Sequence, residues 1–149
     1  MHFITGGAYN GKRKWVKKHY EPNQYRWLSA YDTDTLMTPV STDLSATVIL
    51  EGVEKWIHAQ IGPERSTNTL RKNVINLFTP WLQWEKVDSG RNLVIIGTDI
   101  SKGIVPIDKR DRMWRDITGW TYQDLAGRAE RVDIIWYGME ETIKNKREL

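Results

Sequence analysis

The sequence predicts an α/β fold in which helices cover a mostly parallel sheet. Two observations lead to this prediction: short segments that are apolar on both faces, and helical patterns between them. The predicted strands are residues 3–5 (FIT), 46–50 (ATVIL), 93–97 (LVIIG) and 132–137 (VDIIWY), with a weaker one at 24–30 (QYRWLSA). Runs without polar alternation are typical of central strands that are buried on both sides.

Four segments with helical spacing separate these strands, at residues 12–19, 52–61, 67–84 and 109–128. In the second, Val53, Trp56 and Ile57 share one helix face. Ser66 or Thr67 can cap the third, and Pro80 inside it predicts a kink or break. The polar, turn-rich residues 31–45 are predicted to be a loop over the ligand-binding edge of the sheet.

Length and composition predict a single domain spanning residues 1–149. The chain has 149 residues, of which 40% are hydrophobic and 28% charged, and a formal net charge of +3. It contains no cysteine, which excludes disulfides and thiolate chemistry. The first apolar run is too short for a signal peptide, and no run approaches the ~20 residues of a membrane-spanning helix. We therefore expect a cytoplasmic protein. Nucleic-acid binding by the basic segment 12–19 is a weaker alternative, because the net charge is small.

A glycine-rich turn follows the first predicted strand and precedes the first predicted helix. It comprises Gly6, Gly7, Ala8, Tyr9, Asn10, Gly11 and Lys12, which match the spacing G-x-x-x-x-G-K of a phosphate-binding loop. Successive backbone N–H groups of such a loop form an anion nest, and the helix dipole adds to it. We therefore predict that this loop binds phosphate groups, with Lys12 at the outer phosphates. The alternative is a strand–turn–helix connection that merely tolerates glycines.

Arg13 stands where this loop ordinarily has the Ser or Thr that binds Mg²⁺. A guanidinium has no acceptor atom, so Arg13 cannot ligate a metal. Its side chain either lies in solvent or contacts phosphate directly, as an electrostatic substitute for the metal.

Two acidic residues, Glu51 and Asp99, follow the predicted apolar strands. Strand ends of this kind carry the acid that holds Mg²⁺ in P-loop enzymes. We predict Lys12, Glu51 and Asp99 as catalytic residues, and Glu51 and Asp99 as Mg²⁺ ligands. The alternative is the commoner role of a lone acid near a helix N-terminus or in a loop.

Residues 2–12, 48–52 and 97–144 resemble the adenosylcobinamide kinase/adenosylcobinamide-phosphate guanylyltransferase family of cobalamin biosynthesis. The segment 102–106 (KGIVP) is similar to the family's G-I-V-P. Residues 114–126 resemble its F-R-D-x-x-G-R-x-N-Q-x-x-A helix through Trp114, Arg115, Asp116, Gly119 and Gln123, and 132–136 resemble the strand that follows.

This resemblance implies a P-loop NTPase-like domain, a three-layer sandwich that binds ATP or GTP. It implies further that the chain uses this nucleotide with Mg²⁺ to phosphorylate the aminopropanol hydroxyl of a cobinamide. It also implies GMP transfer through a guanylylated histidine, and assembly as a homotrimer. The chain departs from the family where that histidine belongs, because residues 31–46 contain none and His19 and His58 lie elsewhere. We therefore predict a kinase that lacks guanylyltransferase activity. The alternative is a non-catalytic relative that binds a nucleotide or a partner subunit, which Arg13, Trp120 and Tyr122 favour.

Overall fold

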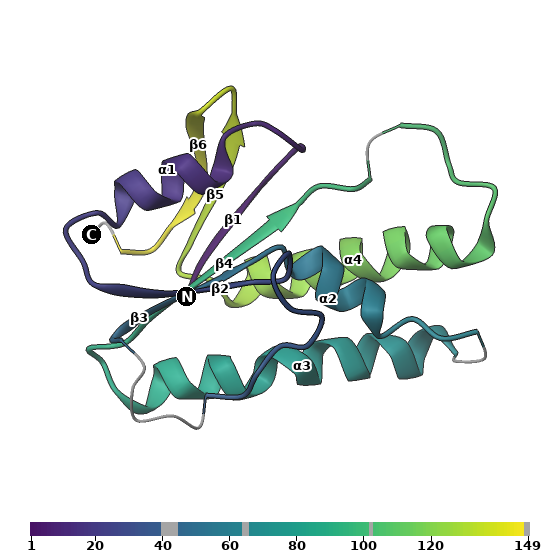
Figure 1. The fold of residues 1–149 in the computed structure, drawn as a ribbon, viewed down its shortest axis with the longest axis horizontal. Helices are drawn as coiled ribbons and strands as arrows, with labels where there is room; N and C mark the ends of the chain where they lie inside the picture. Colours follow the sequence, from purple (N-terminus) through teal and green to yellow (C-terminus); the bar gives the residue numbers. More distant parts are fainter. Residues whose placement is uncertain (40–44, 64–65, 102, 148–149) are drawn as a thin grey trace.

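The chain forms an α/β structure in which a six-stranded sheet carries helices on both faces (Figure 1). The computed structural model describes residues 1–39, 45–63, 66–101 and 103–147. The strands are β1 (His2–Gly6), β2 (Tyr25–Ser29), β3 (Thr47–Glu51), β4 (Asn92–Thr98), β5 (Arg131–Trp136) and β6 (Met139–Asn145). The helices are α1 (Lys12–His19), α2 (Val53–Ala59), α3 (Thr67–Val87) and α4 (Lys109–Arg128). The predicted fold class is confirmed.

The strand order β2-β3-β4-β1-β5-β6 places the most apolar strands in the middle of the sheet. All neighbouring pairs from β2 to β5 are parallel, and β6 runs antiparallel to β5. β3 is buried along its whole length, and β4 is buried at all but its first and last residues. Because these strands are apolar on both faces, they would expose apolar surface at an edge of the sheet. In its centre, helices cover both of their faces.

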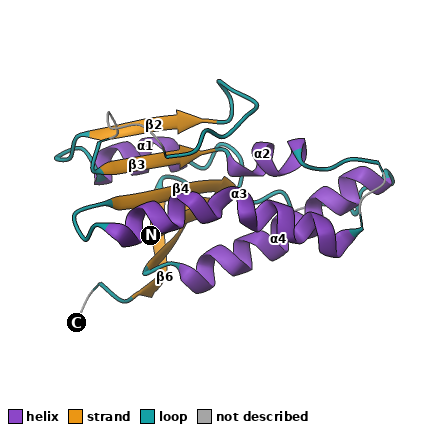
Figure 2. Cartoon of the chain, turned by 90° about the horizontal axis from the view of Figure 1, so that it is seen from below, coloured by secondary structure: helices purple, strands orange, loops and turns teal. Residues whose placement is uncertain are grey.

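Helices cover the two faces unequally, and Figure 2 looks onto the more heavily covered one. Leu93 and Ile95 of β4 belong to the core that α2, α3 and α4 complete. Val94 and Ile96, which point the other way, pack in a smaller cluster with Val16 of α1. Within the described residues, no helix combines the length and apolar character that a bilayer crossing requires.

The connections at β1 and β4 create a crevice at the carboxyl ends of the strands. β1 and β4 are neighbours, but α1 follows β1 on one face whereas α4 follows β4 on the other. Adjacent strands whose connections leave in opposite directions open a gap at that edge, which is the usual ligand position in open α/β sheets.

The structure adds the strand β6, which the sequence pattern did not predict. β5 and β6 are joined by Tyr137 and Gly138, with φ values of 49° and 76°. Two positive φ angles are typical of the tight turn that matches the twist of a hairpin. β6 is exposed over most of its length and lacks an apolar face, so its sequence carries no burial signal.

Helix α3 continues through Pro80 without the break that the sequence suggested. The neighbouring side chains Phe78 and Trp81 are fully buried, so packing holds the helix together at this point. The Thr79 hydroxyl donates to the carbonyl oxygen of Ile75 at 2.9 Å, one helical turn earlier. Tertiary burial therefore outweighs the local preference of proline.

The segment predicted as a loop over the ligand-binding edge covers that edge only at its start. Tyr31 lies at that edge, but the chain then packs against the helices, where Leu36 joins the main core. The Trp56 indole donates to the carbonyl oxygen of Thr33, and the Trp81 indole to that of Met37. Residues 40–44 of the predicted loop lie outside the described residues.

A buried polar network holds the start of β1. His2 Nδ1 lies 2.7 Å from the Tyr20 hydroxyl, and its Nε2 lies 2.5 Å from Asp133 of β5. Arg131 and Thr142 also donate to this carboxylate. Burial lowers the pKa of His2, with Asp133 opposing the shift. Burial would raise the pKa of Asp133, but the hydrogen bonds from His2, Thr142 and Arg131 bring it to about 2.

This network predicts that the free energy of unfolding falls as the pH drops from neutral. The folded-state pKa values of His2 and Asp133 both lie below their unfolded values of about 6.5 and about 3.9. The unfolded chain therefore takes up protons first, so stability is complete above pH ~6.5 and is lost progressively below it. Urea unfolding at a series of pH values measures this loss.

His2→Gln should reduce the part of the loss that begins near pH ~6.5 by the share due to His2. His19, whose pKa burial also lowers, keeps its own share of that loss. His58→Gln deletes a histidine of α2 outside the network and is the matched control, which should retain the loss. Identical pH profiles for wild type and His2→Gln would contradict the prediction.

Candidate functional site

The glycine loop between β1 and α1 has backbone angles that its sequence permits. Gly6 has φ 148° and Gly11 has φ 88°, and Tyr9 at the loop tip has φ 60° with a fully exposed side chain. A Cβ atom on Gly6 would lie 2.4 Å from the carbonyl oxygen of Ile135 in β5. Glycine is therefore required at the first position of the loop, both by its φ angle and by the close approach of β5.

The β5–β6 turn braces the far end of this loop. The amide N–H of Gly138 donates to the backbone oxygen of Asn10 at 2.8 Å, and that of Tyr137 to its side-chain oxygen at 3.3 Å. A Cβ on Gly11 would lie 3.2 Å from the Cα of Gly138. The loop is thus fixed by β5 on one side and by the hairpin turn on the other.

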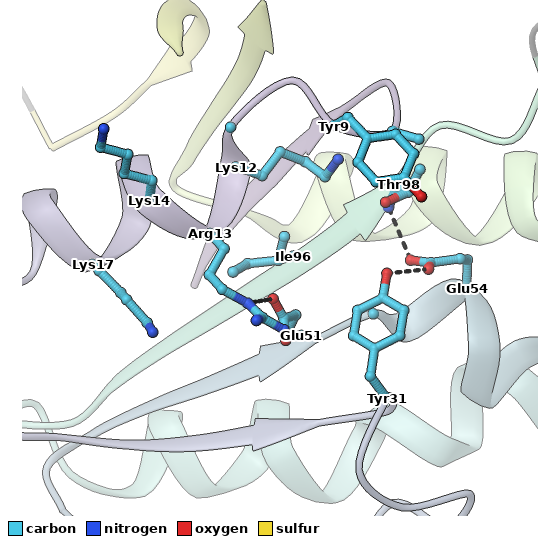
Figure 3. Close-up of a pocket in the computed structure, with 13 residues that line it drawn as sticks. Tyr9, Lys12, Arg13, Lys14, Lys17, Tyr31, Glu51, Glu54, Ile96 and Thr98 are labelled. Atoms are coloured by element: carbon cyan, nitrogen blue, oxygen red, sulfur yellow. Dashed lines mark hydrogen bonds and ion pairs between the residues drawn. The ribbon is translucent and has the colours of Figure 1, made fainter. Parts of the chain in front are cut away.

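A cavity of about 730 Å³ opens beside the loop, at the carboxyl ends of β1, β3 and β4 (Figure 3). It coincides with the crevice between β1 and β4. Its lining residues are Ala8, Tyr9, Gly11, Lys12, Arg13, Lys14, Lys17, Tyr31, Glu51, Gly52, Glu54, Ile96 and Thr98.

Lys12 opens α1, and its side chain folds back over the loop. Its Nζ donates to the carbonyl oxygen of Gly7 at 2.7 Å, and the residue is only 8% exposed. Burial lowers the pKa of Lys12, whereas the carboxylates of Glu54, Glu51 and Asp99 act in the opposite direction. The ammonium is held at the wall of the cavity formed by the loop.

Arg13 forms a two-point ion pair with Glu51 at the end of β3 (Figure 3). Its Nε and Nη2 atoms lie 2.6 Å from Oε2 and Oε1 of the carboxylate. Two parallel N–H···O bonds give this contact both strength and a fixed orientation. The pair connects α1 to the sheet across the cavity.

Both oxygens of Glu51 accept hydrogen bonds from the protein. Besides the two bonds from Arg13, its Oε1 accepts from the Ser29 hydroxyl at 2.7 Å and the Trp27 indole at 3.2 Å. Burial would raise the pKa of Glu51, but the hydrogen bonds from Arg13, Ser29 and Trp27 hold it below its ordinary value. Glu51 is therefore an ionised carboxylate whose oxygen atoms are already occupied.

Glu54 is a second buried carboxylate in the cavity, and it is not among the predicted site residues. Its Oε1 accepts from the backbone N–H of Thr98, and its Oε2 accepts from the Tyr31 hydroxyl. Burial and the charge of Glu54 raise the pKa of Tyr31 to about 12, so the phenol remains a donor. The signal was present in the order Glu51-Gly52-Val53-Glu54. Gly52, with φ 78°, turns the chain from β3 into α2 so that both acids face the cavity.

The predicted site residues are brought together only in part. Six of them line the cavity: Ala8, Tyr9, Gly11, Lys12, Arg13 and Glu51. Gly6, Gly7 and Asn10 shape the loop behind it without lining it. Asp99 does not line the cavity, and its Oδ1 accepts from both the backbone N–H and the hydroxyl of Ser101, two residues further on.

These side chains do not fit the predicted Mg²⁺ as they are arranged. Magnesium requires oxygen ligands in near-octahedral positions, commonly including one or two carboxylates. Arg13 supplies no acceptor, both oxygens of Glu51 accept hydrogen bonds, and Oδ1 of Asp99 is bonded to Ser101. Across the described residues, no group of three or more His, Cys, Asp or Glu side chains is arranged to hold a metal.

The three histidines of the chain all lie away from the cavity lining. His2 is buried in the network at the opposite end of β1, and His19 stacks on Trp15 with ring centres 4.8 Å apart. His58 packs edge-on against Trp114. His19 lines a second cavity together with Gly11 of the glycine loop, but none of the three histidines lines the cavity that holds Glu51 and Glu54.

Comparison with known proteins adds one finding. The model of the family described as cobinamide kinase / cobinamide phosphate guanyltransferase matches residues 10–143. The matched range includes Gly11, Lys12 and Arg13 but begins after the first four residues of the glycine loop. A search of curated proteins finds no match.

The close approach of Gly6 to β5 predicts that Gly6→Ala lowers the free energy of unfolding by at least ~2 kcal/mol. The added Cβ meets the Ile135 oxygen, and the φ angle is unfavourable for alanine. Gly127→Ala is the matched control, because Gly127 lies in α4 and a Cβ added there would meet no atom within 4 Å. It should raise stability by ~0.5–1 kcal/mol. Urea unfolding measures both, and similar shifts in the two variants would argue against the packing described here.

Proposed function

Because the chain belongs to the cobinamide kinase / cobinamide phosphate guanyltransferase family, as its sequence predicted, we propose that it acts in cobalamin biosynthesis on a cobinamide, using a nucleoside triphosphate. The observation that carries this proposal is the cavity beside the glycine loop. Two cations from the start of α1, Lys12 and Arg13, and two carboxylates, Glu51 and Glu54, line it together. The phosphate chain of ATP or GTP would lie against residues 6–12.

The reaction we propose is transfer of the γ-phosphoryl group to the aminopropanol hydroxyl of the cobinamide. The hydroxyl oxygen forms a bond to the γ-phosphorus while the bond from that phosphorus to the β–γ bridging oxygen breaks. The hydroxyl proton leaves to a carboxylate or to water. Catalysis of this kind depends on positioning and on stabilising charge rather than on a covalent intermediate.

The chain's own residues divide these tasks. Lys12 would offset the charge of the outer phosphates, and a bound phosphate would favour its protonated form. Glu54 is the carboxylate of the cavity for which the described residues show no ion pair, so it is the candidate for the hydroxyl proton. Glu51 would orient Arg13. Asp99, predicted as catalytic, would have to exchange its bonds to Ser101 for bonds to the ligand.

We propose that the guanylyltransferase half-reaction is absent. Transfer through a guanylylated histidine needs that nucleophile beside the nucleotide, and none of the three histidines lines the cavity. Assembly as a trimer, which the family resemblance implies, stays a prediction.

A second candidate function is nucleotide or partner binding without turnover. The specific observation in its favour is the Arg13–Glu51 pair. Arg13 stands in place of the metal-binding hydroxyl of the loop, and its guanidinium also occupies the Glu51 carboxylate. Turnover and binding, measured on the same preparation, distinguish the two candidates.

Labelled nucleotides test the proposed reaction. With adenosylcobinamide as acceptor, the label of γ-labelled ATP or GTP should appear in cobinamide phosphate. The label of α-labelled GTP should appear neither on the protein nor on the cobinamide product. Nucleotide binding without γ-transfer would select the non-catalytic alternative, and covalent α-label would contradict the loss of guanylyl transfer.

Lys12→Ala should weaken nucleotide binding at least ~10-fold, since a charge-assisted hydrogen bond contributes ~1.5–3 kcal/mol. Lys18→Ala removes the same charge from α1 outside this cavity and is the matched control, expected to bind as the wild type does. Isothermal titration calorimetry measures both. Unchanged binding by Lys12→Ala would remove the glycine loop from the phosphate site.

A further inference from the structure

Two positions that a P-loop ordinarily links through a metal are in direct contact in this chain. Arg13 follows the loop lysine, where the sequence pattern has its metal-binding hydroxyl. Glu51 ends β3, where an acid ordinarily holds the metal. Here the guanidinium and the carboxylate meet through two bonds of 2.6 Å.

Both oxygens of the Glu51 carboxylate are engaged by the protein. Oε1 accepts from Arg13, Ser29 and Trp27, and Oε2 accepts from Arg13. A metal at this carboxylate would have to bind Oε2 directly beside the positive charge of the Arg13 guanidinium. The Glu51 side chain is 6% exposed, so water-bridged coordination of a metal would also require this arrangement to open.

The Arg13 guanidinium, in contrast, retains donors. Its contacts with Glu51 involve Nε and Nη2, whereas the side chain is 55% exposed and lines the cavity. A guanidinium held in plane by a carboxylate on one edge presents its other N–H groups in the geometry that matches phosphate oxygens. Figure 3 shows Arg13 between Lys12 and Lys17, with all three side chains on the α1 side of the cavity.

The charges of the cavity also favour an anion without a bound metal. Four cationic side chains (Lys12, Arg13, Lys14 and Lys17) line it, against the two carboxylates Glu51 and Glu54. A magnesium ion accompanying the phosphates would add two positive charges to a wall that is already cationic.

From this geometry we propose that Arg13, oriented by Glu51, replaces the divalent cation, so that the chain binds the phosphates of a nucleoside triphosphate without a metal. This inference rests on the proposed function, because it assumes that the cavity holds a nucleotide. It goes further than that function, because it gives the role of compensating the negative charge of the phosphates to the Arg13 side chain in place of a metal.

Calorimetric titration of the wild-type chain with ATP and with GTP tests the proposal directly. The dissociation constant in excess EDTA should agree within about 3-fold with that in excess Mg²⁺, a difference smaller than one bidentate contact. Binding that requires Mg²⁺ would overturn the inference while leaving the proposed function intact. Absence of binding under both conditions would overturn both.

Arg13→Ser restores the loop hydroxyl and releases two sites on Glu51. In EDTA it should bind at least ~10-fold more weakly than the wild type, because a charge-assisted phosphate contact is lost. Added Mg²⁺ should recover part of that affinity in the variant only. Lys18→Ser removes one charge from α1 outside this cavity, and it should leave affinity within about 2-fold of the wild type under both conditions.

Affinity of Arg13→Ser in EDTA equal to that of the wild type would show that the guanidinium does not contact the ligand, and would overturn the proposal. The comparison of EDTA with Mg²⁺ on the wild-type chain uses no substitution, so the test stands whatever the stability of the variant.

Discussion

Glu51 is a carboxylate buried at the end of strand β3, and a buried carboxylate must have partners for its charge. The rest of the site depends on how this requirement is met. Removing an ionised group from water is costly unless charge and hydrogen bonds replace the lost solvation. The replacement comes from two elements: Arg13 from α1, and Trp27 and Ser29 from β2. The pairing thereby fixes the spacing between α1 and the β2–β3 half of the sheet. The cavity lies within that spacing, so its shape depends on how one charge is satisfied.

The elements that could be predicted are those determined by residues within or next to the element itself. Apolar runs identified the central strands, and the predicted bounds of α1 and α4 match the structure. In the structure, the side chain of Asp108 caps α4 by accepting from the N–H of Arg110, a signal that the prediction from helical spacing did not use. β6 was missed because an exposed hairpin strand needs no apolar pattern, and the continuity of α3 at Pro80 depends on burial by distant residues.

The site also has a part that the sequence predicts and a part that it does not. The glycine loop and the two acids at strand ends could be read from spacing, but their partners could not. Arg13 and Glu51 are 38 positions apart, and nothing local to either one specifies the contact. Glu54 follows Glu51 closely in the sequence, but the structure was needed to show that the left-handed turn at Gly52 places both acids in one cavity. Asp99 lies just after the strand end, as predicted, but its side chain bonds to Ser101 and does not line the cavity. Position at a strand end therefore does not by itself place a side chain in the site.

The β5–β6 hairpin, described above as a brace for the glycine loop, also determines how the sheet ends. An outer strand offers unpaired backbone groups to any other strand, and proteins resist such edge-to-edge aggregation by placing charges there. In the described sheet β6 is the outer strand, and its side chains Glu140 and Glu141 are exposed around Met139 and Ile143. At the opposite edge, β2 exposes Arg26. The hairpin that holds the loop in place thus also places charged side chains on an outer edge of the described sheet.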